Sequence, residues 1–120
     1  MTNRKQSLGR WGEEHAAAYL EQHDYHVVAR NVRTAYGELD LVAQQGETLV
    51  FVEVKTRTSD SYGLPEEAVT PLKAAHILAS AQAYLQEHGD ENTAWRVDVV
   101  AIRKMPGADV EVVVFEDAVH

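Results

Sequence analysis

Four charged residues lie inside two short apolar runs on either side of a glycine-containing turn. The stretch from Gly37 to Arg57 reads GELDLVAQQGETLVFVEVKTR. Its first run carries Glu38 and Asp40, and its second run carries Glu53 and Lys55. Carboxylates of this kind bind oxygen-preferring divalent cations, and such a cation can activate water for hydrolysis. The stretch therefore predicts a metal-dependent hydrolytic site.

Strand geometry predicts that the four side chains share one face of a hairpin. Glu38 and Asp40 lie two residues apart, as do Glu53 and Lys55, so each pair points to one side of its strand. A tight turn at Gln45-Gly46, with the glycine supplying a positive φ, would place Glu38 opposite Glu53. A four-residue loop keeps this pairing, whereas an odd-length loop or a bulge would change it.

Three carboxylates on one sheet face repel one another, and like charges directly opposite are destabilising. Lys55 supplies one compensating positive charge. We expect a divalent cation to supply the rest. The alternative that remains open is a purely structural network of ion pairs around Lys55.

The segment from Ser7 to about His23 is predicted to form a helix with Ser7 as its N-cap. Its predicted buried face consists of Leu8, Trp11, His15, Ala18 and Tyr19. Glu13 lies one turn into this helix. Its carboxylate could interact favourably with the positive end of the helix dipole, or it could point at the hairpin as a further acidic group.

Two arginines and an amide precede the hairpin. Tyr25 to Ala29 is a short β-branched run that predicts a strand, and Arg30, Asn31 and Arg33 follow it. Arginine offers a planar fork of donors that matches a phosphate, so these residues and Arg57 are candidates for binding a nucleic-acid backbone. A solvated connecting loop explains the same residues equally well.

A turn-rich segment and a second helix follow the hairpin. Thr58 to Pro65 leaves directly from the strand that bears Lys55, where a substrate-facing loop would lie. Thr70-Pro71 predicts the start of the helix and Gly89 its end. The predicted buried stripe of this helix consists of Leu72, Ala75, Leu78, Ala79, Gln82 and Leu85.

Trp95 to Ile102 is predicted to be a strand, and Val110 to Phe115 completes a last hairpin after a turn at Pro106-Gly107. Asp98 lies among valines on the first of these strands. We assign its side chain to the solvent face, in preference to a supporting role behind the site.

Composition predicts a single domain over residues 1–120, with loose tails at 1–6 and 116–120. Cysteine is absent, which excludes disulfides and thiolate metal sites and fits the cytoplasm. No apolar run approaches the ~20 residues that span a bilayer, and no apolar signal core follows the N-terminus.

The net charge of −8 argues against a protein that wraps a long polyanion. The acidic excess is concentrated late in the chain, because residues 59–120 carry four basic and eleven acidic residues. Residues 1–36 carry five basic and four acidic residues. An enzyme that meets a phosphodiester through a metal needs only local positive potential.

The hairpin resembles the PD-(D/E)XK nuclease superfamily, which has the restriction-endonuclease-like fold. The matching residues are Asp40 and, after twelve intervening residues, Glu53-Val54-Lys55. The wider sequence resembles the small bacterial YraN family of predicted nucleases. The residues that carry this resemblance are Gly9, Gly12-Glu13, Arg30-Asn31, GELDL from Gly37, LVFVEVKTR from Leu49, Gly63, Glu67-Ala68-Val69, Lys73 and Arg96-Val97-Asp98. The residue before Asp40 is Leu39, where the superfamily pattern has proline.

This resemblance implies an α/β fold with a central mixed sheet of about five strands and two main helices. It implies an endonuclease in DNA processing or repair that acts on structured or branched DNA, by similarity to archaeal Holliday junction resolvases. Mg²⁺ or Mn²⁺ would be held by Asp40, Glu53 and the Val54 carbonyl, with Glu13 or Glu38 completing the shell. Lys55 would orient or deprotonate the attacking water. A homodimer is implied by the same similarity, and the alternative function is a non-catalytic nucleic-acid-binding or assembly module on this fold.

Overall fold

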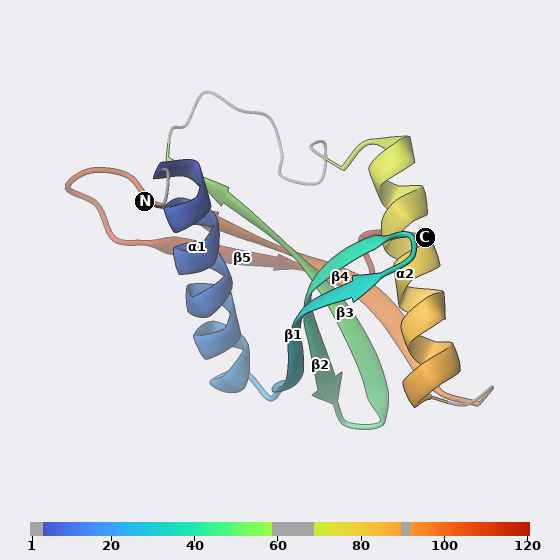
Figure 1. Ribbon diagram of the computed structural model, residues 1–120. Coiled ribbons are helices and arrows are strands. Elements are labelled where there is room, and N and C mark those ends of the chain that lie inside the picture. Colours follow the sequence, from blue (N-terminus) through green and yellow to red (C-terminus); the bar gives the residue numbers. More distant parts are fainter. Residues whose placement is uncertain (1–3, 59–68, 90–91) are drawn as a thin grey trace.

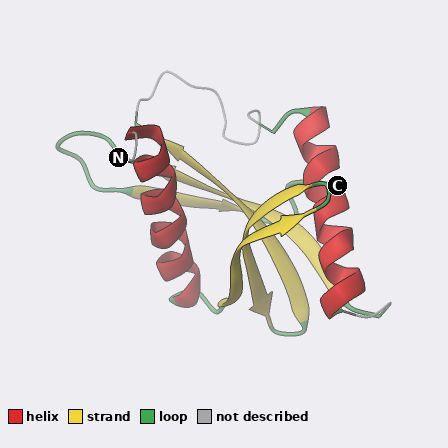
Figure 2. Cartoon of the chain, viewed as in Figure 1, coloured by secondary structure: helices red, strands yellow, loops and turns green. Residues whose placement is uncertain are grey.

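Five strands form one mixed sheet between two helices. The computed structural model describes residues 4–58, 69–89 and 92–120. The strand order is β1-β2-β3-β4-β5, and one helix lies on each side of the sheet (Figures 1 and 2). The predicted α/β architecture is confirmed. The elements are α1 (Arg4–Glu21), β1 (His26–Thr34), β2 (Gly37–Gln45), β3 (Thr48–Arg57), α2 (Pro71–His88), β4 (Ala94–Arg103) and β5 (Glu111–Phe115).

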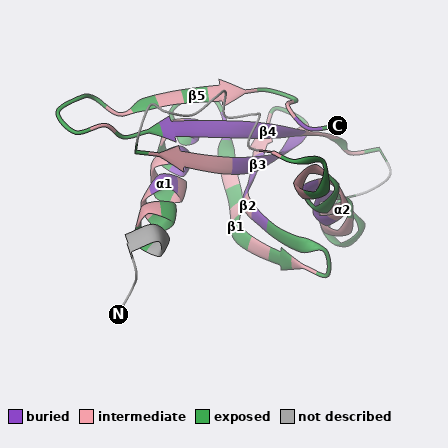
Figure 3. Ribbon diagram, turned by 90° about the horizontal axis from the view of Figure 1, so that it is seen from above, coloured by how far each residue is buried: buried purple, intermediate pink, exposed green. Residues whose placement is uncertain are grey.

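The central strands β3 and β4 run parallel, whereas the neighbouring pairs are antiparallel. Parallel pairing needs a long crossover connection, and the segment containing α2 supplies it. Both strands are apolar along most of their length because helices cover both faces of the sheet. Figure 3 shows this as buried residues running along β4 and β3, whereas β1 is exposed or intermediate throughout.

Two hydrophobic clusters occupy the two faces of the sheet. The α1 cluster includes Ala16, Ala17, Leu20, Leu41, Val50, Val52 and Val100. The α2 cluster includes Val42, Phe51, Ile77, Ala81, Val97 and Val99. Alternate residues of β3 therefore belong to opposite faces, and Glu53 and Lys55 continue the series of Leu49 and Phe51 on the α2 side.

The predicted buried face of α1 is wrong. The helix begins at Arg4, so Ser7 lies inside it, and it turns Gly12, Ala16, Ala17 and Leu20 toward the sheet. Small residues occupy this face because α1 packs closely against β3. A Cβ at Gly12 would collide with the Thr56 hydroxyl. The larger rings of Trp11 and His15 stack on each other at the edge of this contact, and Ala18 is exposed.

The predicted stripe of α2 is partly wrong, although its two ends are confirmed and Leu78 and Leu85 do pack against the core. The Thr70 side chain accepts a hydrogen bond from the Lys73 amide, Pro71 occupies the first turn, and the Gly89 amide donates to the Leu85 carbonyl. The buried residues are Ile77, Ser80 and Ala81, whereas Leu72, Ala75 and Gln82 are exposed. Alanines and other apolar residues of α2 occur on all sides of the helix, so its sequence shows no single apolar stripe.

The register of the β2–β3 hairpin differs by two residues from the prediction. Gln45 pairs with Thr48, so Gly46 and Glu47 form the turn, and Val42 lies opposite Phe51 instead of Leu49. Gly46 has the expected positive φ of 58°. A shift of two residues preserves the faces of a paired strand, so this error does not by itself separate Asp40 from Glu53.

Asp98 is fully buried, so its assignment to the solvent face is wrong. Its carboxylate accepts hydrogen bonds from Tyr25 Oη at 3.1 Å and from Arg96 Nε at 2.9 Å. The amide of Asp117 donates to the same carboxylate at 2.9 Å, and Arg96 also reaches the Gln45 side chain at 2.7 Å. Positions 96 and 98 lie on the same side of the strand, which allows the arginine to follow the aspartate into the interior.

The C-terminal segment is packed, contrary to the expected loose tail at 116–120. Val119 is buried in the α2 cluster, and the Ala118 amide donates to the Val97 carbonyl at 2.8 Å. The turn-rich segment Thr58–Pro65 lies outside the described residues except for Thr58. Over the described ranges, neither helix is long and apolar enough to cross a membrane.

Candidate active site

Three carboxylates converge from three different elements: Glu13 from α1, Asp40 from β2 and Glu53 from β3. The paired part of the hairpin ends at Leu41 and Val52. Just beyond this point Asp40 Oδ2 accepts a hydrogen bond from the Val54 amide at 2.9 Å. The carboxylate thus takes an amide that would otherwise serve the strand ladder, and this contact holds Asp40 beside Glu53.

The charge balance of this cluster is unfavourable. Burial raises the pKa of Asp40 to about 7, and the negative charges of Glu53 and Glu13 add to the rise against the opposing effect of the Val54 amide. The pKa of Glu13 is also raised, first by burial and then by the neighbouring Glu38. Buried carboxylates that repel one another in this way are typical of functional sites.

Two lysines share one oxygen of Glu53. Lys55 Nζ lies 3.3 Å and Lys73 Nζ lies 3.1 Å from Glu53 Oε1, and Glu53 itself is only 8% exposed. Burial lowers the pKa of Lys55, and its contact with Lys73 lowers it further. The site therefore contains one lysine that gives up its proton more readily than a free lysine does.

Lys73 is a member of the site that no spacing in the sequence singled out. It reaches the hairpin because the Thr70 cap starts α2 immediately before it, with the Lys73 amide 3.2 Å from Thr70 Oγ1. The capping motif itself was readable from the sequence. The packing of α2 against the face of β3 that carries Glu53 brings Lys73 to this carboxylate. That packing was not readable from the sequence.

Two of the residues predicted to bind nucleic acid, Asn31 and Arg33, lie at the rim of the cluster. The amide of Asn31, oriented by its neighbours, donates to Glu13 Oε2 at 3.0 Å and to Glu38 Oε1 at 3.1 Å. Asn31 has a positive φ of 51°, which turns its side chain at this point of β1. Arg33 Nε lies 4.0 Å from Glu38 Oε2.

Glu38 therefore belongs to the outer part of the site, between Asn31 and Arg33, and not to the contact between Asp40 and Glu53. Arg30 is exposed on the same strand β1, and Arg57 lies at the end of β3.

The donor set fits a divalent cation of the oxygen-preferring kind. Its carboxylates are desolvated and repel one another, and a bound cation would remove that repulsion. As the side chains stand, no three Asp, Glu or His side chains in residues 4–58, 69–89 and 92–120 form a metal-holding group. The lysine ammonium groups hold Glu53 instead, so a cation would compete with Lys73 and Lys55 for this carboxylate.

Comparison with known proteins places most of the chain in one family. The family model of "Uncharacterised protein family UPF0102" matches residues 12–102. A UPF0102 protein of Syntrophotalea carbinolica is 47% identical over 98% of this chain and 95% of its own length. Another, from Dehalococcoides mccartyi, is 47% identical over 83% of this chain and 82% of its own length.

A solved structure shows the same fold at low sequence identity. The chain is similar to Hjc, a Holliday junction resolvase of Archaeoglobus fulgidus, with a TM-score of 0.50 and 17% identity. The match covers 87% of this chain and 74% of that chain. This likeness shows a nuclease-like α/β fold.

Proposed function

The chain belongs to the uncharacterised protein family UPF0102, the YraN family, and we propose that it is a metal-dependent nuclease that cleaves phosphodiester bonds in structured or branched DNA. The observation that carries the proposal is the meeting of Glu13, Asp40 and Glu53 beside Lys55 on a nuclease-like fold. An ordinary structural cluster would balance these charges. Here burial, together with the negative charges of Glu53 and Glu13, raises the pKa of Asp40 to about 7.

Asp40 and Glu53 would hold Mg²⁺ or Mn²⁺, with Glu13 and the Val54 carbonyl as further ligands. When bound, the cation would polarise the phosphodiester and lower the pKa of a water molecule. The hydrogen bond from the Val54 amide fixes the orientation of the Asp40 carboxylate, so that this ligand is positioned before the cation arrives.

The two lysines would have different tasks. The Lys55 side chain is only 12% exposed, and its pKa is lowered. These properties suit a group that orients the attacking water or accepts a proton from it. The Lys73 side chain is 41% exposed and stands nearer to solvent. Lys73 would pair with the substrate phosphate and stabilise charge that develops there.

DNA is proposed as the substrate because Arg33, beside Glu38, and the exposed Arg30 offer donor forks on β1, and because Hjc is itself a Holliday junction resolvase. The net charge of −8 limits the contact to a short stretch around the cation. A branched substrate suits such an enzyme, since shape near the cleaved bond can then contribute to recognition.

The test is cleavage of four-way junction, flapped and linear duplex DNA in the presence of Mg²⁺ or Mn²⁺. Wild-type protein should cleave at least one of these substrates, and EDTA should stop the reaction. Lys55→Ala should lower the rate by about 10² or more, as loss of a proton-transfer group does. Arg103→Ala is the matched control: it removes a positive charge that pairs with Glu111 at 3.9 Å and should leave cleavage unchanged.

One observation favours a second function, binding without cleavage. Glu53 is already neutralised by Lys55 and Lys73, so the cluster could persist without a cation. In that case the protein would bind branched DNA tightly, no metal would support cleavage, and Lys55→Ala would leave the affinity unchanged.

A further inference from the structure

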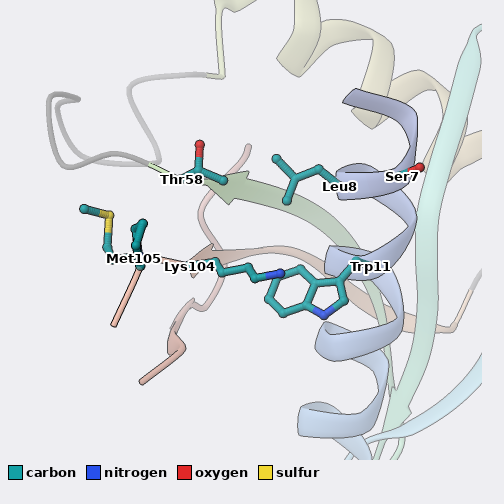
Figure 4. A pocket seen from close by; sticks show the side chains of 7 residues that line it. Ser7, Leu8, Trp11, Thr58, Lys104 and Met105 are labelled. Carbon is teal, nitrogen blue, oxygen red and sulfur yellow. The ribbon is translucent and has the colours of Figure 1, made fainter. Parts of the chain in front are cut away.

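A pocket of about 870 Å³ lies outside the carboxylate cluster, beside the first turns of α1. Its walls come from α1, from the end of β3 and from the turn that follows β4, as Figure 4 shows. The lining residues are Ser7, Leu8, Trp11, Thr58, Lys104, Met105 and Pro106. The volume falls in the range of pockets that bind small molecules or single groups of larger ligands.

The pocket combines an aromatic ring with a positive charge. Lys104 Nζ lies 4.6 Å from the centre of the Trp11 ring, and both side chains face the cavity in Figure 4. Trp11 also stacks on His15, with ring centres 5.1 Å apart, which restricts its orientation. The Lys104 amide donates to the Arg57 carbonyl at 2.8 Å, so the backbone beneath the lysine is tied to β3.

The chemistry of this lining selects one class of ligand. The Lys104 ammonium group lies over the Trp11 ring in the free protein, so another planar ring would stack there once this flexible side chain moves aside, and stacking of this kind accepts any nucleobase. The ammonium group suits an attached phosphate, Thr58 adds a hydroxyl, and none of the described lining residues is acidic. In a chain of net charge −8, a pocket with this lining is complementary to an anionic aromatic group.

We propose that this pocket binds one unpaired nucleobase of a nucleic-acid strand, stacked on Trp11, with the adjoining phosphate on Lys104. The inference rests on the proposed function and names the feature of the substrate that the site recognises. Trp11 lies two residues before Glu13 on α1, and Thr58 follows the end of β3, three residues after Lys55. The pocket is thus built on elements that also carry the carboxylate cluster, and a strand that occupied both would have to pass around α1, because residues two apart on a helix do not share a face.

An unpaired base is a general property of flaps, junction branches and single strands. It is absent from an intact duplex. The pocket would therefore favour branched DNA without reading its sequence, which is the preference that stacking on an aromatic side chain produces.

The experiment uses tryptophan fluorescence and DNA binding in EDTA, so that no cleavage occurs. Trp11 and Trp95 are the two tryptophans of the chain, and Trp95→Phe leaves Trp11 as the single reporter. A short oligothymidine strand should quench its emission, and an abasic strand of equal length should not. By anisotropy of labelled strands, Trp11→Leu should weaken binding of oligothymidine roughly tenfold to a hundredfold and leave the abasic strand unaffected.

Because Trp11 also packs against the α1 cluster, Lys104→Gln provides a second variant that changes no core residue. It should weaken binding several-fold, whereas Arg103→Gln, which removes one positive charge next to it in sequence, should not. Equal binding of thymidine and abasic strands by wild type and Trp11→Leu would overturn the proposal. The proposal would also be overturned if thymidine monophosphate bound as tightly as the oligothymidine strand. The same holds if the quenching depended on protein concentration, because two copies of the chain would then be associating.

Failure of the proposed nuclease activity would be seen separately, as no cleavage with Mg²⁺ or Mn²⁺ despite base-dependent quenching in EDTA. Cleavage of branched DNA that is identical in wild type, Trp11→Leu and Lys104→Gln, without any quenching, would refute the pocket and leave the nuclease.

Discussion

Asp40 and Asp98 are both aspartates on central strands of the same sheet, yet their surroundings are opposite. Asp98 is fully buried and receives hydrogen bonds from Arg96, Tyr25 and the Asp117 amide. Asp40 receives one from the Val54 amide and lies beside two further carboxylates. Its pKa is raised to about 7.

The difference separates a carboxylate that supports the fold from one to which we assign a proposed function. A buried charge that is paired and fully hydrogen-bonded supports the fold, and removal of one partner leaves the other exposed to a low dielectric. A carboxylate that is buried among like charges weakens the metal-free protein, and the arrangement is useful only if a cation or a proton arrives. Burial alone does not distinguish these two cases, whereas the identity of the partners does.

The largest expected effect is on the Asp98 side of this comparison. Asp98→Ala would leave the guanidinium of Arg96, whose side chain is 19% exposed, without its carboxylate partner. We expect a loss of about 3–5 kcal/mol in the free energy of unfolding, measured by urea denaturation. Asp109→Ala, at an exposed position, should change it by less than about 0.5 kcal/mol. A small loss at Asp98 would mean that the network is not structural.

Removal of the Asp40 charge should raise the free energy of unfolding, whereas removal of Asp98 should lower it. The folded-state pKa is raised from 3.8 to about 7, so the native state holds a proton that the unfolded state releases. The stability from this group is full below pH 3.8 and is lost as the pH rises through about 7. In EDTA, Asp40→Asn should therefore become more stable than wild type over this range, by at most roughly 4 kcal/mol.

Urea denaturation of both proteins between pH 4 and pH 8 gives this difference directly, and Asp109→Asn serves as a control for a change of one charge. If Asp40→Asn lost stability at neutral pH, the ionised carboxylate would be held by a positive partner such as Lys55, and the cluster would resemble Asp98 after all.

The smallest effect is expected at Lys73. Its pair with Glu53 is half-exposed at the lysine end, so Lys73→Met should cost less than about 1 kcal/mol of unfolding free energy. The same substitution removes a positive charge beside Lys55, so the pKa of Lys55 should rise. NMR titration of the Lys55 side chain measures this shift, with Lys104→Met as a control. An unchanged titration would mean that the two lysines do not act on each other.

The hairpin was predictable because its logic is local. Alternation predicts a common face for Glu38, Asp40, Glu53 and Lys55 for any even loop. Asp40 does lie beside Glu53 although the turn was misplaced by one residue, at Gly46-Glu47, whereas Glu38 lies apart beside Asn31 and Arg33. The end signals of α2, Thr70 and Gly89, were equally local.

What could not be predicted depends on packing between elements. The close fit of Gly12 against Thr56 determines which side of α1 faces the sheet. The spacing of apolar residues predicted instead the side that carries the larger Trp11. Lys73 enters the site only through the position of α2. The burial of Asp98 needs Tyr25, which is distant in sequence, although Arg96 two residues away was a readable sign of a partner.

The central claim is that the cluster around Asp40 binds a divalent cation, and isothermal titration of Mn²⁺ into the protein tests it most directly. We predict that wild type binds Mn²⁺, that Asp40→Asn binds none under the same conditions, and that Asp109→Asn binds as wild type does. If wild type took up no Mn²⁺, or if Asp40→Asn bound it equally well, the carboxylates would not form a metal site and the proposed mechanism would be wrong.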